Sequence, residues 1–400
     1  MSNIYKNFIN NIEKKNKEFK PIVKYSKTNY YEIIISKKIS NLNNNDILFC
    51  GNSNHKVKQL NKNKQNYMFI PKNKITNIYK IIPTQVKTIS DLISISNSNP
   101  LEYNHKYNIP LQKIHDIKPY LIELDSFIGI NDLKLQILDQ ILYIIQDFHV
   151  GSKDYLHTIL SGPPGTGKTE IAEIIGKIYG NIGILKKGSF KKVTRSDLIG
   201  GYLGQTAIKT KEIIEGCLGG VLFIDEAYAL GNSDNGDSFS KECIDTLCES
   251  LSNYRENLMV IIAGYDEELE KCFFSYNQGL ASRFVWKFKI EKYTALELSK
   301  ILRKKINDCN WNIELSNDFL KQWIETNLIW FPNYGRDIEN LITKIKISHS
   351  KRFFGKEENN KKIITELDLN NGFKIYSNNE NLNLLIGKKN ENTYLSYLYV

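Results

Sequence analysis

The eight residues Gly162-Pro163-Pro164-Gly165-Thr166-Gly167-Lys168-Thr169 decide how the rest of the chain is interpreted. They fit the pattern G-x-x-x-x-G-K-[ST], in which glycines let successive backbone N–H groups surround phosphate oxygens. In that pattern the lysine reaches the terminal phosphates and the hydroxyl of Ser or Thr binds magnesium. Residues 156–160 (LHTIL) predict a short buried strand before the loop, and residues 168–179 have the apolar spacing of a helix after it. Strand, loop and helix therefore come in the order that a phosphate-binding loop requires.

A second motif, Val221-Leu222-Phe223-Ile224-Asp225-Glu226, places two carboxylates directly after a fully apolar strand. Such strands are buried on both faces of a parallel sheet, and open sheets of this kind bind ligands at the carboxyl ends of their strands. Asp225 is predicted to hold the water shell of Mg²⁺, and Glu226 to orient and polarise an attacking water molecule. The two motifs together predict a site for ATP and Mg²⁺.

The order of elements along the 400 residues indicates several domains. From Leu121, apolar strands alternate with amphipathic helices, which is typical of a parallel sheet covered by helices. We expect strands near residues 182–185, 192–194, 258–263 and 286–290, and only helices beyond Glu291. Residues 1–120 are predicted to form an unassigned β-rich or α+β accessory region, followed within that range by a linker that Pro110 and Pro119 mark. The remaining chain is predicted to form an α/β domain at 121–290, a small all-helical domain at 291–376 and a polar tail at 377–400.

The net charge of +10 is located in the N-terminal region. Residues 1–120 contain 20 Lys and 7 acidic residues, a balance of +13, so the remaining 280 residues sum to −3. One interpretation is an anionic partner such as nucleic acid. The other, which we favour, is a compositional bias toward Asn, Lys, Ile and Tyr, because the lysines are dispersed instead of gathered on one helix face.

Several classes of protein are disfavoured by the composition. No apolar run approaches the roughly 18 residues that span a bilayer, and the N-terminal residues lack the apolar core of a signal peptide. The six cysteines include no C-x-x-C pair, so neither a zinc site nor a disulfide framework is indicated. We expect reduced thiols and a cytoplasmic location, in the host cytoplasm if the protein is viral.

With these motifs assembled, the chain resembles the AAA+ ATPases, in the CfxQ group that includes red-type Rubisco activases and stage V sporulation protein K. The resemblance covers residues 121–376 and leaves the N-terminal third outside. The stretches that carry it are GPPGTGKT at Gly162, RSDLIGGYLGQTAIKT at Arg195, VLFIDEAYAL at Val221, YRENLMVIIAGY at Tyr254, GLASRF at Gly279 and NYGRDIENL at Asn333.

The resemblance implies a P-loop AAA+ sheet followed by a helical lid, and it implies roles for further residues. Arg283 falls at the position of the arginine finger that reaches the γ-phosphate of a neighbouring subunit, and Arg336 at the sensor-2 position of the lid. Tyr202 matches the pore-loop aromatic residue of a hexamer. Ile128 and Gly129 match the segment that lines the adenine pocket. The sensor-1 position holds Tyr265 where many relatives have Asn, which leaves the residue in that role open.

Three functions are compatible with these features. The first is an ATP-hydrolysing homo-hexameric ring that remodels or threads a protein substrate. The second is a nucleic-acid-associated AAA+ ATPase that uses the basic N-terminal region. The third is a scaffold that binds nucleotide and scarcely turns it over, against which the complete set of Lys168, Thr169, Asp225, Glu226 and Arg283 argues.

Overall fold

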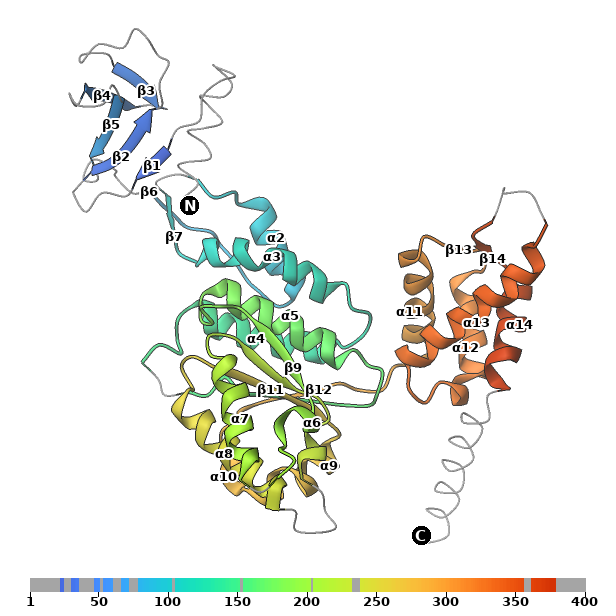
Figure 1. Ribbon diagram of the computed structural model, residues 1–400. Coiled ribbons are helices and arrows are strands. Elements are labelled where there is room, and N and C mark those ends of the chain that lie inside the picture. The colour runs from blue at the N-terminus through green and yellow to red at the C-terminus, as the bar shows by residue number, and fades with distance from the viewer. Residues whose placement is uncertain are drawn as a thin grey trace. The chain divides into compact units, whose positions relative to one another are not determined.

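The computed structural model describes residues 22–24, 30–35, 47–50, 53–59, 66–71, 78–102, 105–151, 154–202, 204–231, 238–355 and 361–378. The chain divides into two compact units, one of Met1–Gln85 with Ile95–Gln112 and one of Val86–Ser94 with Lys113–Val400. The second unit contains both predicted nucleotide motifs (Figure 1). Most of the tail predicted at residues 377–400 lies outside the described residues.

The first unit contains a five-stranded sheet of order β1-β2-β5-β4-β3, in which all pairings are antiparallel. Its strands are β1 (Ile22–Lys24), β2 (Tyr30–Ile35), β3 (Ile47–Cys50), β4 (Ser53–Gln59) and β5 (Asn66–Pro71). A separate parallel pair joins β6 (Ile78–Lys80) to β7 (His105–Tyr107). Helix α2 (Ile89–Ser98) contributes residues to both units.

The second unit is built on a five-stranded parallel sheet of order β12-β8-β11-β10-β9. The strands are β8 (Thr158–Ser161), β9 (Phe190–Val193), β10 (Val221–Ile224), β11 (Met259–Gly264) and β12 (Trp286–Lys289). The chain leaves β8 for the far edge at β9 and returns later to the opposite edge at β12. This reversal places the end of β8 at a switch point of the sheet, where open α/β sheets bind ligands.

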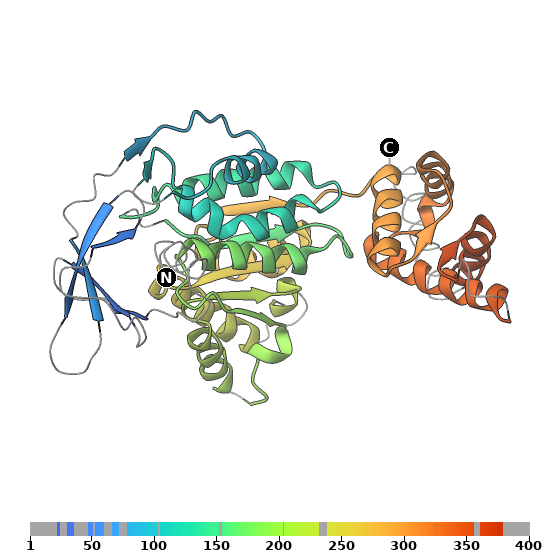
Figure 2. The same ribbon diagram turned by 90° about the horizontal axis from the view of Figure 1, so that it is seen from above.

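Helices cover both faces of this sheet (Figures 1 and 2). The helices of this part of the chain are α3 (Leu111–Asp125), α4 (Asn131–Ile145), α5 (Lys168–Ile182), α6 (Arg195–Leu198), α7 (Gln205–Gly216), α8 (Ser238–Asn253), α9 (Asp266–Cys272) and α10 (Gln278–Ala281), with 3₁₀ turns η2 (Ala227–Leu230) and η3 (Phe274–Tyr276). Every residue of β10 and β11 is buried, because α5 packs on one face while α7 and α8 complete an apolar cluster on the other.

Two predictions about local structure are wrong. The strand expected at residues 182–185 does not form, because α5 continues to Ile182 and ends at Gly183, whose φ is +95°. The buried Ile182 is the last residue of the helix, the buried Leu185 lies in the turn after it, and the next strand begins at Phe190. Pro119, expected to mark a linker, lies inside helix α3. An apolar pattern does not by itself distinguish a strand from a buried helix end.

The C-terminal part of the second unit is mainly helical, as predicted. It consists of α11 (Ala295–Asp308), α12 (Asn317–Thr326), η4 (Leu328–Trp330), α13 (Gly335–Phe353) and α14 (Glu366–Ser377) around its own apolar core. A further prediction, that only helices occur beyond Glu291, is also wrong, because β13 (Asn312–Ile313) and β14 (Ile363–Ile364) form a two-residue parallel pair there. We call residues 291–378 the lid.

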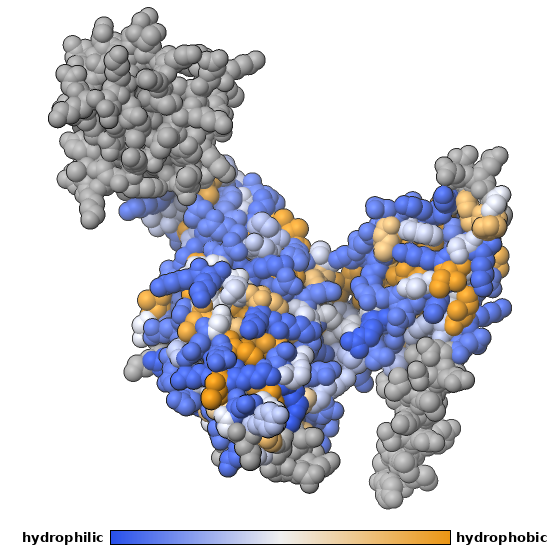
Figure 3. Space-filling model, viewed as in Figure 1, coloured by the Kyte–Doolittle hydropathy of each residue, from blue (hydrophilic) through white to orange (hydrophobic). Residues whose placement is uncertain are grey.

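The surface seen in Figure 3 is mostly hydrophilic, with smaller apolar patches over the α/β part and the lid. Among the described residues, none of the helices combines the length and the apolar character needed to cross a membrane.

Candidate active site

The phosphate-binding loop connects β8 to α5 and depends on glycine geometry at its centre. Gly165 has a φ of +68°, and a β-carbon at this position would lie 1.9 Å from the carbonyl oxygen of Asn333. Gly167 caps α5 with a φ of +86°. The Thr166 hydroxyl donates to the Pro163 carbonyl over 2.8 Å and closes the loop. The glycines are therefore needed both for the turn and for the approach of the lid backbone.

The ammonium of Lys168 lies within the loop. Its Nζ donates hydrogen bonds to the carbonyl oxygens of Gly162 (2.8 Å) and Pro163 (2.7 Å). Burial lowers the pKa of Lys168, and the nearby Asp225 carboxylate opposes that shift. The ring centroid of Tyr265 lies 5.7 Å from the same Nζ. A bound phosphate would offer this ammonium a charged acceptor, which forms stronger hydrogen bonds than carbonyl groups do.

The predicted site residues gather around one cavity of about 620 Å³. Those that line it are Ile128, Pro164, Gly165, Thr166, Gly167, Lys168, Thr169, Asp225, Glu226 and Arg336. Gly162 and Pro163 contribute the carbonyls that hold Lys168. The cavity therefore brings together the loop after β8, the acid pair after β10 and the starts of α5 and α13, which are far apart in the sequence.

Glu226 follows β10 in a strained backbone conformation. Its φ and ψ are 52° and 47°, in the left-handed region, and it caps the 3₁₀ turn η2. This conformation costs a non-glycine residue about 1–2 kcal/mol. Strain of this kind is found at functional sites, where the surroundings hold a side chain in one direction. The turn leaves the Glu226 side chain exposed.

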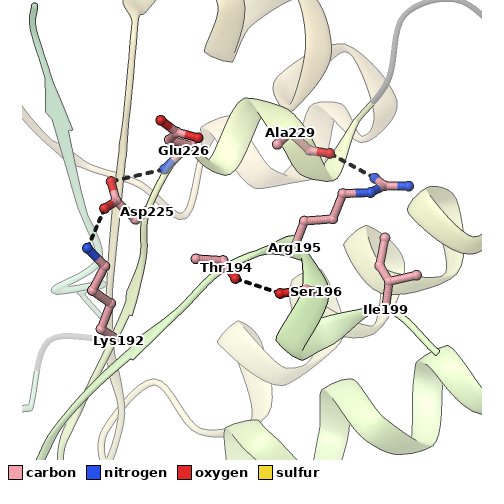
Figure 4. Close-up of a pocket in the computed structure, with 8 residues that line it drawn as sticks. All are labelled: Lys192, Thr194, Arg195, Ser196, Ile199, Asp225, Glu226 and Ala229. Carbon is pink, nitrogen blue, oxygen red and sulfur yellow. Dashed lines mark hydrogen bonds and ion pairs between the residues drawn. The ribbon is translucent and has the colours of Figure 1, made fainter. Parts of the chain in front are cut away.

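Both oxygens of the Asp225 carboxylate have partners in the protein (Figure 4). Oδ1 accepts a hydrogen bond from the Glu226 amide over 3.2 Å. Oδ2 forms an ion pair of 2.6 Å with Nζ of Lys192, which lies on the neighbouring strand β9. The sequence did not predict this partner, because an exposed strand lysine in a lysine-rich chain looks like an ordinary solvated residue.

A second cavity, of about 550 Å³, also has the acid pair in its lining (Figure 4). Its other lining residues include Lys192, Thr194 and Arg195. Arg195 donates from one guanidinium nitrogen to the Ala229 carbonyl over 2.7 Å, and from the same nitrogen to the Ser240 hydroxyl over 2.8 Å. Arg195 thereby fastens the turn after the acid pair to helix α8.

The lid contacts the phosphate-binding loop through two hydrogen bonds. The Gly335 amide, at the start of α13, donates to the Gly165 carbonyl over 2.9 Å. The Tyr293 hydroxyl donates to the Thr166 carbonyl over 3.2 Å. Burial raises the pKa of Tyr293 to about 12, so this hydroxyl remains a donor at neutral pH. Nothing in the sequence marks Tyr293 for this contact, since a tyrosine outside the motifs carries no signal of its own.

The segment before α4 also contributes to the cavity, and a β-carbon on its Gly129 would lie 3.3 Å from the ring of Tyr293. Gly129 (φ +71°) and Ile130 (φ +51°) are both left-handed and turn the chain into α4. Ile128 and Phe127 line the cavity, and a β-carbon on Gly167 would lie 3.3 Å from the Phe127 ring. Of the predicted pair, Ile128 lines the cavity, whereas Gly129 is absent from its lining and lies against Glu297 and Tyr293 of the lid. Phe127 adds a ring that the sequence motifs did not mark.

Arg283 and Tyr202 lie outside this cavity. In the described part of the chain, Arg283 is absent from the lining of both cavities and donates from Nε to the Ser252 hydroxyl over 2.7 Å. Tyr202 is 75% exposed, in a loop that ends at Gly204 with a φ of +80°. Among the described residues, neither side chain therefore lines the cavity that holds Lys168 and the acid pair.

The donor chemistry of the cavity fits Mg²⁺. Thr169 offers a hydroxyl and Asp225 a carboxylate, and both line the same space as Lys168. Within the described residues, no group of three or more His, Cys, Asp or Glu side chains could hold a metal by itself. This agrees with magnesium sites that use one or two protein oxygens together with nucleotide phosphates and water.

Comparisons with known proteins agree with this geometry. Residues 158–288 match the ATPase family associated with various cellular activities (AAA). A cfxQ-like protein of Acanthamoeba polyphaga mimivirus is 39% identical over 274 residues, which is 68% of each chain. A CfxQ homolog of Pyropia yezoensis is 38% identical over 54% of this chain and 71% of its own. Stage V sporulation protein K of Bacillus subtilis is 35% identical over 56% of this chain and 72% of its own.

Proposed function

This chain belongs to the AAA ATPases, in their CfxQ group, and from that premise we propose that it hydrolyses ATP in a homo-hexameric ring. The work of the ring is to remodel or thread a protein substrate through a central pore. A cytoplasmic location is part of the same proposal and rests on the scattered, unpaired spacing of the cysteines.

The proposed chemistry assigns one task to each group in the cavity. Backbone amides of the loop and the Lys168 ammonium bind the β- and γ-phosphates. Thr169 and Asp225 would hold Mg²⁺, which would supply positive charge against the negative charge that develops in phosphoryl transfer. The exposed Glu226 carboxylate orients a water molecule for in-line attack on the γ-phosphorus. Arg336 lines the cavity from the lid and offers a further cation to the phosphates.

One contrast supports the proposed ring: the acid pair lies in the nucleotide cavity, whereas Arg283 does not. Asp225, Glu226 and Lys168 share one cavity, whereas Arg283 is half-buried elsewhere in the described residues and donates to Ser252. A phosphoryl-transfer site gains roughly 10³ to 10⁵ in rate from an arginine supplied by a partner. We therefore assign Arg283 to the site of a neighbouring copy, so that each cavity is completed only by assembly.

A mixing experiment tests this assignment. Arg283→Ala subunits keep a complete phosphate-binding loop, and Lys168→Ala subunits keep the arginine, so each is expected to be inactive alone. Mixed rings should recover part of the ATPase rate, because some sites then pair an intact loop with an intact arginine. Absence of recovery at every mixing ratio would remove Arg283 from a shared site.

Glu226→Gln tests the hydrolytic step separately. Loss of the carboxylate should abolish turnover and leave binding of a fluorescent ATP analogue intact, because Lys168 and the loop amides are unchanged. Retained turnover would exclude Glu226 as the residue that orients water.

Tyr202 is proposed to grip the substrate polypeptide, and its 75% exposure at the tip of a glycine-flanked loop supports that role. Tyr202→Ala should preserve basal ATP hydrolysis and lose any stimulation by an unfolded protein. Tyr202→Phe serves as the matched control, since it keeps the ring and removes only the hydroxyl.

The basic residues of the N-terminal region support a second candidate, a nucleic-acid-associated ATPase. Residues 1–120 contain 20 Lys and 7 acidic residues. ATPase stimulation by single- or double-stranded DNA that falls steeply with salt would favour this candidate over protein remodelling.

A further inference from the structure

We propose that Lys192 is an internal counter-cation of the Asp225 carboxylate, and that Mg²⁺ must displace it when metal and nucleotide bind together. The inference rests on the proposed function, because it takes Asp225 as the carboxylate that holds the metal. It goes further by naming a residue that sets the concentration of magnesium the site requires.

The two side chains are brought together by the register of adjacent strands. Strands β9 and β10 pair in parallel with Lys192 opposite Phe223, and the Asp225 amide donates to the Val193 carbonyl over 3.1 Å. The Lys192 ammonium lies 5.9 Å from the ring centroid of Phe223 and 2.6 Å from Oδ2 of Asp225. The lysine therefore reaches along the sheet toward the end of β10, where the metal-holding carboxylate stands.

The ion pair competes with the hydrated metal for Oδ2 of this carboxylate. Oδ1 of Asp225 already accepts the Glu226 amide, and Oδ2 faces the Lys192 ammonium at 2.6 Å. That separation leaves no space for a water molecule between the two groups. A divalent cation near this carboxylate would also be repelled by the ammonium charge, so Mg²⁺ gains its full attraction to Asp225 only when Lys192 moves away.

Exposure indicates that the ion pair is easily displaced. The Lys192 side chain is 45% exposed and that of Asp225 is 23% exposed. Pairs with this degree of solvent contact are weak and screened by salt. The second cavity, of about 550 Å³ and lined by Lys192, Thr194 and Ser196, has room for the displaced ammonium (Figure 4). The ion pair thus raises the concentration of Mg²⁺ that is needed for binding at Asp225, but it does not prevent that binding.

A magnesium titration of nucleotide binding tests the proposal without relying on turnover. The affinity of full-length protein for a fluorescent, non-hydrolysable ATP analogue is measured by anisotropy from EDTA to millimolar MgCl₂. Lys192→Met should lower the MgCl₂ concentration at the midpoint by about three- to tenfold, because one neighbouring positive charge is removed. Lys192→Arg, which retains the charge, should stay near the wild-type midpoint.

Lys191→Met is the matched control. Lys191 is the preceding residue of β9, is also exposed, and points to the opposite face of the sheet because side chains alternate along a strand. Its midpoint should equal that of the wild type. A Lys192→Met midpoint that is unchanged or higher would overturn the proposal, as would an equal shift in Lys191→Met.

Asp225→Asn separates failure of this inference from failure of the proposed metal role. If Asp225 holds the metal, its variant should lose most of the gain in affinity that MgCl₂ gives. A full magnesium effect in Asp225→Asn would refute the metal role itself. If Asp225→Asn loses the gain in affinity that MgCl₂ gives, but the MgCl₂ midpoint of Lys192→Met is unchanged, only the counter-cation role of Lys192 is refuted. Circular dichroism melting curves check that each variant is folded.

Discussion

The amide of Gly335 donates a hydrogen bond to the carbonyl of Gly165 over 2.9 Å, so the first residue of lid helix α13 is bonded to the phosphate-binding loop. The approach is so close that a β-carbon on Gly335 would lie 2.7 Å from the Gly165 oxygen. Because Arg336 follows Gly335 directly, this hydrogen bond also fixes where the lid arginine enters the nucleotide cavity.

Gly165→Ala should destabilise the protein more than an ordinary left-handed glycine substitution does. The new methyl group would lie 1.9 Å from the Asn333 oxygen, and the φ of +68° adds strain. We expect a loss of about 2–5 kcal/mol in the free energy of unfolding, from about 1–2 kcal/mol of strain and about 1–3 kcal/mol of overpacking. Urea denaturation of the wild type and the variant measures this loss in the free energy of unfolding.

Gly183→Ala is the control for that variant, because Gly183 has a φ of +95° and nothing within 4 Å of the added carbon. It should show the strain alone, about 1–2 kcal/mol. Equal losses in the two variants would mean that contact between loop and lid does not contribute.

Tyr293→Phe should weaken nucleotide binding with little change in packing. The variant removes the hydroxyl that donates to the Thr166 carbonyl and leaves the ring in place. One such hydrogen bond is worth about 0.5–1.5 kcal/mol, so the Kd for a fluorescent ATP analogue should rise about two- to tenfold. Tyr202→Phe, in an exposed loop, should leave the Kd unchanged. An unaltered Kd in Tyr293→Phe would limit that hydroxyl to a purely structural role.

Glu226→Gly should make the nucleotide-free protein more stable while it abolishes turnover. Glycine adopts the observed φ of 52° without the steric cost that Glu226 carries. The expected gain is up to about 1 kcal/mol, because the added entropy of glycine in the unfolded chain offsets part of the relief. Glu226→Gln should show no gain, since it keeps the β-carbon. Urea denaturation of both variants decides whether the strain at the acid pair is real.

His157 should make stability depend on pH below neutrality. Burial lowers the pKa of His157 to about 4, and its Nδ1 accepts the Val260 amide over 3.1 Å. The unfolded chain, with a histidine pKa near 6.5, binds more protons between pH 6.5 and 4, so stability falls as the pH falls through that window. Between pH 7.5 and 5.0 the loss from this residue should be about 2 kcal/mol.

The measurement for His157 is the urea midpoint at pH 7.5 and 5.0. His157→Gln should be less stable than the wild type at pH 7.5, because it disturbs a fully buried position. Between pH 7.5 and 5.0, however, the variant should lose about 2 kcal/mol less stability than the wild type does. An identical pH dependence in both proteins would assign the loss to other groups.

The α/β core was predictable because its elements have strong local signals. Residues 221–224 are all apolar and form β10, and the helical spacing predicted at residues 168–179 lies within α5. The error at residues 182–185 arose where a buried helix end has the same apolar pattern as a short strand. Tertiary packing decided between them, since Gly183 ends the helix and Leu185 fills the core from a turn.

The sequence by itself determined the chemical groups of the site: the loop glycines, Lys168, Thr169 and the acid pair. Their spacing is local and specific, so the motifs are readable without a fold. The tertiary structure decided what surrounds those groups. Strand pairing brings Lys192 into an ion pair with Asp225, and the Gly335 amide donates to the Gly165 carbonyl although the two residues are 170 positions apart in the sequence. Such contacts depend on register and on the path of the backbone, which the identity of a lysine or a glycine does not encode.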